Sequence, residues 1–349
     1  MASGRAKALR AVTAVPFLLL AAWCLQAMDL EKIVAHQRPF DEAGMIEWAD
    51  GKVAIIENFF KVDILNQIWR GTTATFAPST LGFDSIGSWQ MFSFLIDLGP
   101  LQAIWLLESE RAANAYTPAY LPSIFTLLGQ FSGGGIVAPL FYFFSIVFGP
   151  SASDLARQPP RSRSVWFENS LPLLPLILIL HTLEVFAMFL APDLSTRHYW
   201  TWAWQLTPFW IAIFNILFTQ AGRLLRPENT ISVSPKTMLS ILGSISAGVW
   251  VYTLIASPHS ISTIFIPEAD AQSEFIQHTR KALQADELGA FLASFLWLAY
   301  SFFDLHIAGL VDNSWLFYAA SIPIVTICVG PGAAFILGWY WRENLISGQ

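Results

Sequence analysis

Long apolar runs dominate the chain, and they limit its fold more than any other feature. A helix that crosses a membrane needs about 20 mostly apolar residues, and we identify eight stretches that approach or exceed that length. Only 13% of the 349 residues are charged, too few to cover the surface of a soluble protein of this size. The sequence therefore predicts an all-α protein: a single transmembrane domain over residues 1–349 with about eight membrane-spanning helices. The predicted spans are residues 11–28, 89–107, 122–148, 171–190, 199–218, 238–256, 288–310 and 315–339.

Most connections between the predicted spans are short, with two exceptions. Residues 29–88 are expected to form a long loop that lies along the interface or caps the mouth of the bundle, because charges interrupt their apolar pattern. Residues 257–287 are expected to form a polar connection. The first apolar run follows Arg5, Lys7 and Arg10, and we interpret it as a membrane anchor; a cleaved signal peptide is the alternative.

Few ionisable residues fall inside the predicted spans, where a charge costs on the order of 3 kcal/mol by insertion scales. Such residues mark either a functional site or a polar contact between helices. Asp304 follows Trp297 and Tyr300 at helical spacing, so the three side chains share one face that we expect to point inward. His181 and Glu184 are spaced i, i+3, close enough to pair on one side of their helix.

Two further polar residues belong to this set. Counting about 1.5 Å of rise per residue places Asp97 and Asn215 at a depth similar to that of Asp304, so we expect the three to share one polar layer. Two aromatic clusters at span ends fit a belt at the level of the lipid headgroups. These clusters are Trp200, Trp202 and Trp204, and Trp339, Tyr340 and Trp341.

Several kinds of chemistry lack the residues that they need. The net charge of −6 gives no basic surface for a phosphate backbone, so we expect no nucleic-acid partner. Carboxylate-rich DDxxD runs, histidine boxes, a P-loop, GxSxG and GxGxxG are all missing from the sequence, so we expect no metal site and no cofactor. What remains is an aromatic cavity with a few buried carboxyl groups. Buried carboxyl groups can donate protons and aromatic faces can stabilise a cation, which suits an acid-initiated cyclisation.

Two local motifs carry a resemblance to a known family. The first is Glu108-Ser109-Glu110-Arg111 through Asn114, and the second runs from Gly133-Gly134-Gly135 to Pro139 and Tyr142. With its length and span layout, the chain resembles the fungal integral-membrane meroterpenoid cyclases of the ascochlorin and ascofuranone type. The resemblance implies an enzyme of secondary metabolism that protonates an epoxide or alkene on a farnesylated aromatic precursor. Each motif also has a purely structural reading: a surface salt bridge between Glu108 and Arg111, and a close helix crossing at the glycines.

The leading hypothesis from the sequence is a membrane-bound terpene cyclase, an isomerase or lyase that needs no cofactor. In this hypothesis Asp304 or Asp97 protonates the substrate, and His181 with Glu184 positions it or removes the final proton. Trp297 and Tyr300 stabilise the developing cation.

Asn215 orients the acid in the same hypothesis. The expected partners are a small hydrophobic isoprenoid-containing substrate, membrane lipid and other enzymes of the pathway, and the expected location is the endoplasmic reticulum or another endomembrane. Two alternatives stay open: a proton-coupled transporter or exporter of a hydrophobic metabolite, and a non-catalytic membrane scaffold.

Overall fold

The computed structural model describes residues 4–165, 172–225 and 233–348, which form a helical bundle with one small β-hairpin. The all-α fold class is confirmed. In chain order the elements are α1 (Gly4–Thr13), α2 (Val15–Met28), α3 (Leu30–Ala43), β1 (Met45–Trp48), β2 (Gly51–Ala54), α4 (Asp63–Thr80), α5 (Ser85–Glu110), η1 (Ala112–Asn114), η2 (Pro118–Tyr120), α6 (Pro122–Ser132), α7 (Gly134–Phe148), α8 (Ala152–Ala156), α9 (Pro160–Arg163), α10 (Leu173–Ile177), η3 (Leu178–Thr182), α11 (Leu183–Leu190), α12 (Leu194–Trp204), α13 (Thr207–Leu225), α14 (Pro235–Ala256), α15 (Ile261–Phe265), α16 (Phe275–Ile307), α17 (Ser314–Val329) and α18 (Pro331–Ser347).

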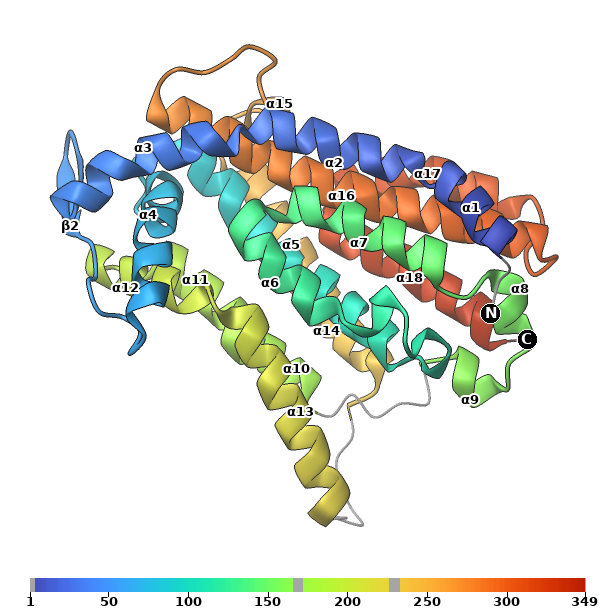
Figure 1. Cartoon of the computed structure of the whole chain (residues 1–349). Helices are drawn as coiled ribbons and strands as arrows, with labels where there is room; N and C mark the ends of the chain where they lie inside the picture. Colours follow the sequence, from blue (N-terminus) through green and yellow to red (C-terminus); the bar gives the residue numbers. More distant parts are fainter. Residues whose placement is uncertain (1–3, 166–171, 226–232, 349) are drawn as a thin grey trace.

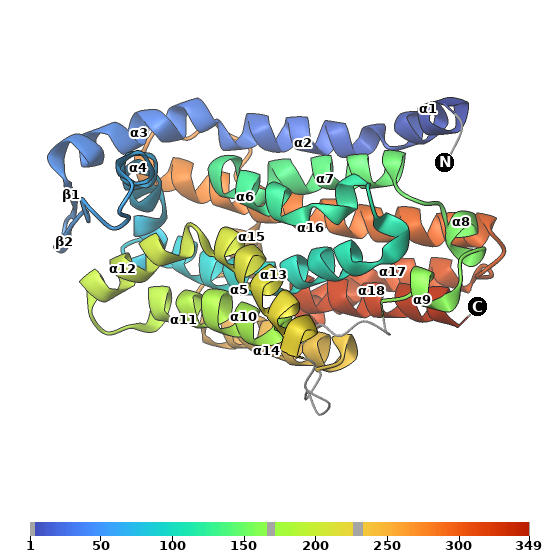
Figure 2. The ribbon, with the colours of Figure 1, turned by 60° about the horizontal axis from the view of Figure 1, so that its bottom comes forward.

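Helix α5 forms the centre of the bundle, because 94% of its most apolar window is buried. It packs against α14, α16 and α18 and also against α4 and α6. Helices α2, α7 and α16 lie side by side along one flank (Figures 1 and 2). Helices α1 and α18 reach the same end of the bundle as α8 (Figure 1).

Within the part of the chain that the structure describes, four helices are long and apolar enough to cross a membrane: Ser85–Glu110, the continuous α10–η3–α11 segment Leu173–Leu190, Pro235–Ala256 and Phe275–Ile307. The bent pair Gly4–Thr13 and Val15–Ala43 gives a fifth if it is counted as one span. Eight spans are therefore not shown by length and composition. The first residue of the predicted span 171–190 lies outside the described residues.

Two predicted spans are broken at glycines. Each of these glycines has a positive φ, a backbone conformation that residues with a side chain rarely adopt. Gly133 has φ +93° and separates α6 from α7 inside the predicted span 122–148. Gly330 has φ +83° and separates α17 from α18 inside the predicted span 315–339. An apolar run does not reveal such a break, because hydropathy is unchanged while the backbone turns.

Residues 29–88, expected to form a loop, instead contain α3, β1, β2 and α4. The two strands pair antiparallel, and they pack with α4 and α12 around a small core separate from the main bundle. Trp69 and Trp202 are fully buried in this core. We call α3, β1, β2, α4 and α12 the capping unit. The second expected loop, residues 257–287, contains α15 and the start of α16.

Candidate functional site

One cavity, which we call the chamber, has a volume of about 340 Å³ and a mainly apolar lining. Pockets of this size and lining are typical sites for small apolar molecules. One face of α5 forms its long wall. At about 1.5 Å of rise per residue this wall extends about 21 Å. Its residues recur at helical intervals: Met91, Phe94, Leu95, Leu98, Leu101, Gln102 and Trp105.

The chamber opens to the surface between α3, α4 and the C-terminal end of α6. Val34, Ile68 and Phe131 line the chamber there and are also 51%, 40% and 52% exposed. Exposed apolar side chains around an opening are typical of a surface that meets a membrane. The opening therefore suits a ligand that arrives from lipid.

Asp286 is the one carboxyl group among the described residues that line the chamber. Its Oδ1 accepts a hydrogen bond of 2.6 Å from the backbone N–H of Gly135, in the first turn of α7. A negative charge near the N-terminus of a helix is stabilised by the helix dipole. The acid is therefore held at the point where α6 ends and α7 begins.

His181 also lines the chamber, and both of its ring nitrogens have partners. The indole N–H of Trp204 donates to Nδ1 at 3.2 Å, and Nε2 lies 2.7 Å from the carbonyl oxygen of Leu95. Since Nδ1 accepts, Nε2 carries the proton and the ring is neutral. His181 thus fixes the wall between α5 and α12, and its proposed role in proton removal stays a prediction.

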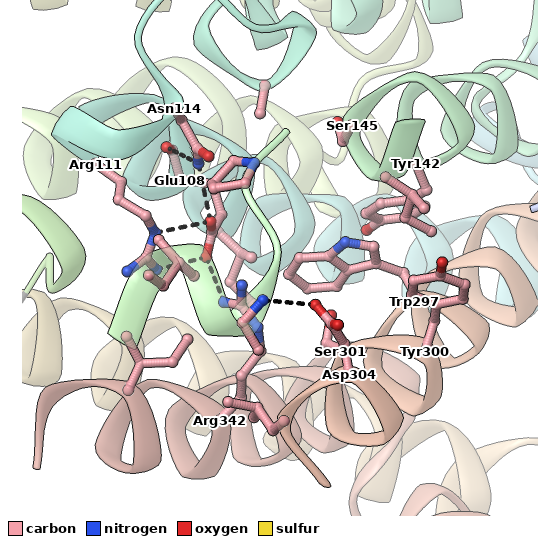
Figure 3. Close-up of a pocket in the computed structure, with 18 of the residues that line it drawn as sticks. Glu108, Arg111, Asn114, Tyr142, Ser145, Trp297, Tyr300, Ser301, Asp304 and Arg342 are labelled. Carbon is pink, nitrogen blue, oxygen red and sulfur yellow. Dashed lines mark hydrogen bonds and ion pairs between the residues drawn. The ribbon is translucent and has the colours of Figure 1, made fainter. Parts of the chain in front are cut away.

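The smaller cavity, of about 70 Å³, brings together three residues predicted from the sequence (Figure 3). Trp297, Tyr300 and Asp304 all line it. Tyr300 shares a hydrogen bond of 3.0 Å with Thr13, and the Asp304 carboxylate accepts 2.6 Å from the N–H of Ala152. This volume has room for a few water molecules rather than for an organic substrate.

A buried ion-pair network borders the small cavity (Figure 3). Glu108 pairs with Arg111 at 2.9 Å and with Arg342 at 2.8 Å, and Arg111 pairs with Glu343 at 2.6 Å. Burial alone would lower the pKa of Arg111, but the two carboxylates raise it above its ordinary value. The interpretation of Glu108 and Arg111 as a surface salt bridge is therefore wrong. The indole N–H of Trp339 donates to Glu108 at 2.8 Å, which places this residue in the interior and not in a headgroup belt.

The same cavity shows how the aromatic residues of the bundle are arranged. The guanidinium of Arg342 lies 4.8 Å from the centre of the Trp297 ring, and Tyr142 stacks on that ring at 5.2 Å. Trp105 donates its N–H to the Tyr142 hydroxyl at 2.9 Å and lines both cavities. Trp105 is therefore the wall between the chamber and the small cavity.

The other predicted site residues line neither of these cavities. Asp97 accepts 2.5 Å from the hydroxyl of Ser246 and caps the start of α18 through the backbone of Gly332. Glu184 accepts 2.6 Å from the hydroxyl of Thr207, so it does not pair with His181. The π-helical turn η3 contains His181 and changes the register that the sequence spacing assumed.

Asn215 lies half-buried on α13, and its Oδ1 has no hydrogen-bond partner in the described part of the chain. Asp97, Asn215 and Asp304 thus share no cavity. The roles assigned from the sequence to these residues and to Glu184 stay predictions. The sequence does not point to Asp286, because residues 257–287 predict a polar connection; α16 begins at Phe275, which places Asp286 inside the bundle. The first half of α16 is polar but buried, and a hydropathy pattern does not reveal such burial.

Three curated fungal proteins are similar to the chain, and each is named a FAD-dependent monooxygenase. The relative from Penicillium polonicum is 30% identical over 352 residues, which cover 97% of this chain and 43% of the relative. The relative from Penicillium roqueforti is 28% identical over 311 residues, which cover 85% of this chain and 36% of the relative. The third, from Botryotinia fuckeliana, is 28% identical with 77% and 36% covered. The chain thus spans less than half the length of the curated relatives it matches.

These names correct the functional hypothesis from the sequence. They point to oxidative chemistry, so the assignment to a cofactor-free terpene cyclase, an isomerase or lyase, is wrong. The cyclase type within the resemblance is likewise not confirmed.

The described residues do not fit FAD itself. Dinucleotides place their pyrophosphate at a glycine-rich turn between a strand and a helix, whereas the strands in the described ranges form one antiparallel hairpin. No Lys or Arg is among the described residues that line the chamber, and Asp286 would repel a pyrophosphate. Of the arginines that line the small cavity, Arg111 and Arg342 are paired with carboxylates and Arg10 donates to the carbonyl of Gly149, and the volume is only about 70 Å³.

A family match accounts for most of the chain. The CtvD domain matches residues 49–264, which run from β2 through α4, α5 and α12 into α15. No solved structure matches the chain. The match covers more than half of the residues, and the chain belongs to the CtvD-domain family.

Proposed function

We propose that this chain is the membrane-embedded, substrate-binding part of a fungal oxidative enzyme. In this proposal the chamber binds an apolar compound on which a FAD-dependent monooxygenase acts. The observation that carries the proposal is the chamber: about 340 Å³, an apolar lining and an opening bordered by exposed apolar side chains. The names of the relatives, whose lengths the chain covers only in part, support the oxidative context.

The substrate in this proposal is hydrophobic and enters from the bilayer, and other enzymes of the same pathway act before or after it. The location is the endoplasmic reticulum or another endomembrane. The shorter apolar helices Gly134–Phe148, Thr207–Ala221 and Ser314–Val329 complete the membrane bundle beside the four long ones. Helices of this length span a bilayer only where it is thinned or where neighbours cover their ends.

Filling the chamber tests the proposal. A side chain at Gly134, which lines the chamber, would meet only the Ala290 Cβ at 4.0 Å, so Gly134→Phe has room for its first atom, and we expect its ring to occupy the cavity. We expect deletion of the gene in the native host to remove an oxygenated metabolite and the Gly134→Phe gene to fail to restore it. Metabolite profiling by mass spectrometry measures both.

Gly248→Phe is the matched control. Gly248 is exposed on α14, and a side chain there would meet nothing within 4 Å. We expect this variant to restore the metabolite, with both variants expressed and thermally stable in detergent. Full restoration by Gly134→Phe, or an unchanged metabolite profile after deletion, would contradict the proposed function.

A further inference from the structure

The two oxygens of the Asp286 carboxyl group have different surroundings. The side chain is buried at 8% exposure, and Oδ1 is engaged by the N–H of Gly135. Over residues 4–165, 172–225 and 233–348 no group donates to Oδ2, although the residue lines the chamber. A buried carboxyl oxygen without a donor costs free energy unless a ligand or water supplies one.

Glycines bring the backbone of α7 close to this carboxyl group. A Cβ on Gly133 would lie 2.6 Å from Oδ1 of Asp286, and a Cβ on Gly135 would lie 2.5 Å from its backbone oxygen. The start of α7 therefore reaches Asp286 only because these positions lack side chains. The close approach engages one carboxyl oxygen, so the other is the one free to face the cavity that Asp286 lines.

Asp97 provides an internal comparison. It caps α18 after Gly330 as Asp286 caps α7 after Gly133. The second oxygen of Asp97 is enclosed and without a partner among the described residues, and Asp97 does not line the chamber. Capping the helix that follows a break is therefore a sufficient structural role for both acids. Of the two, Asp286 is the one that also lines the chamber.

The position of Asp286 along the chamber defines the shape of the ligand. Gln90 at the start of the α5 wall donates to Glu287 at 2.7 Å and to the Leu283 carbonyl at 3.2 Å, so Asp286 lies at the Met91 end. Trp105 lies at the other end, about 21 Å away along the helix. A ligand that fills this space is long and apolar, with its polar group at one end.

We propose that the free carboxyl oxygen of Asp286 binds the hydroxyl group of an elongated apolar ligand in the chamber. This inference rests on the proposed function and names the polar group that the substrate must carry. A hydroxyl donates the hydrogen bond that Oδ2 lacks. An ether of the same length fills the chamber but leaves the oxygen without a donor.

The test compares hexadecanol with hexadecyl methyl ether as competitors of radiolabelled hexadecanol on the purified chain in nanodiscs. We expect the wild-type chain to bind the alcohol about tenfold or more tightly in mildly alkaline buffer, since hydrogen bonds to charged groups have this magnitude. Asp286→Asn keeps an oxygen that accepts from Gly135 and presents an amide N–H₂ to the chamber. This group donates a hydrogen bond that the oxygen of the alcohol or of the ether can accept equally. The preference should then fall to about one.

Glu287→Gln is the matched control, because Glu287 is the neighbouring buried acid, bonds Gln90 and does not line the chamber. We expect this variant to keep the preference of the wild-type chain. A purely structural role of Asp286 would lower thermal stability in Asp286→Asn without changing the ratio of the two affinities, and that result would overturn the inference.

Gly134→Phe separates the two proposals. If it abolishes binding of both probes while Asp286→Asn keeps the tenfold preference, the chamber is the binding site and only the role of Asp286 is refuted. If Gly134→Phe leaves both probes bound as before, the chamber is not the site and both proposals fail. Failure of the wild-type chain to bind either probe overturns the role of Asp286, while the metabolite experiment still decides the proposed function.

Discussion

The chamber and the small cavity lie on either side of Trp105 and differ in what surrounds them. Three acids and three arginines line the small cavity or pair with its lining. Glu108, Glu343, Arg111 and Arg342 form ion pairs with one another, whereas Asp304 accepts from the Ala152 N–H and Arg10 donates to the Gly149 carbonyl. The chamber has one carboxyl group and a lining of apolar and neutral side chains. The comparison teaches that buried charge here is concentrated where helices are joined. Room for a ligand lies instead where charge is sparse.

The largest expected effect tests the charged region. Arg111→Ala removes the cation that pairs with Glu343 and one of the two that pair with Glu108, and breaking a buried pair costs about 3–5 kcal/mol. We expect a loss of this size in the free energy of unfolding, measured in detergent. Exposed Arg38→Ala should change it by less than about 0.5 kcal/mol. Equal effects of the two substitutions would remove the contrast between the cavities.

The second effect tests a buried, neutral histidine of the capping unit, His198. His198 accepts a hydrogen bond of 3.1 Å from Trp202, and burial lowers its pKa from 6.5 to about 4. As pH falls from 6.5 towards 4, the unfolded chain binds a proton that the folded chain does not, so stability is lost. The loss should reach about 3 kcal/mol. His198→Gln should flatten this part of the pH profile of thermal unfolding; an unchanged profile would show that His198 is not the group responsible.

The third effect concerns the wall itself. Trp105→Phe keeps an aromatic ring between the cavities but removes the N–H that donates to Tyr142. We expect a loss of about 1–2 kcal/mol of unfolding free energy. A double-mutant cycle with Tyr142→Phe isolates the pairwise part, which should be about 1 kcal/mol. Strict additivity would mean that this hydrogen bond does not stabilise the wall.

The smallest effect sharpens the comparison at the small cavity. Asp304→Asn keeps an oxygen that accepts from the N–H of Ala152, so the change in unfolding free energy should be about 0.5 kcal/mol. We expect the metabolite profile of the native host to be retained. Its loss in a stably folded variant would mean that the small cavity also acts on the substrate, as the sequence-based role of Asp304 requires.

The sequence predicts the fold class well and the boundaries of the helices less well, for a physical reason. Apolar runs identify α5, α14 and the second half of α16, because lipid and the protein interior select the same side chains. They do not identify the breaks at Gly133 and Gly330, because a turn with positive φ leaves hydropathy unchanged.

The spacing of residues along one helix predicts which side chains share a face, while the catalytic roles assigned to them stay predictions. Trp297, Tyr300 and Asp304 share a cavity as their spacing indicated, since helical periodicity depends only on local geometry. Asp286 and the pairing of Glu108 with Arg342 depend on contacts between distant segments, which spacing along one helix does not encode.

The π-helical turn at Leu178–Thr182 contains one residue more than an α-helix would need, and Leu183 closes it by donating to the carbonyl of Leu178. Deleting the exposed Ile179 should restore a regular helix and rotate the segment after it by about 100° relative to the segment before it. His181 would then lose both Leu95 and Trp204 at once. A one-residue length change in this turn would therefore reshape the chamber wall without substituting any side chain that lines it.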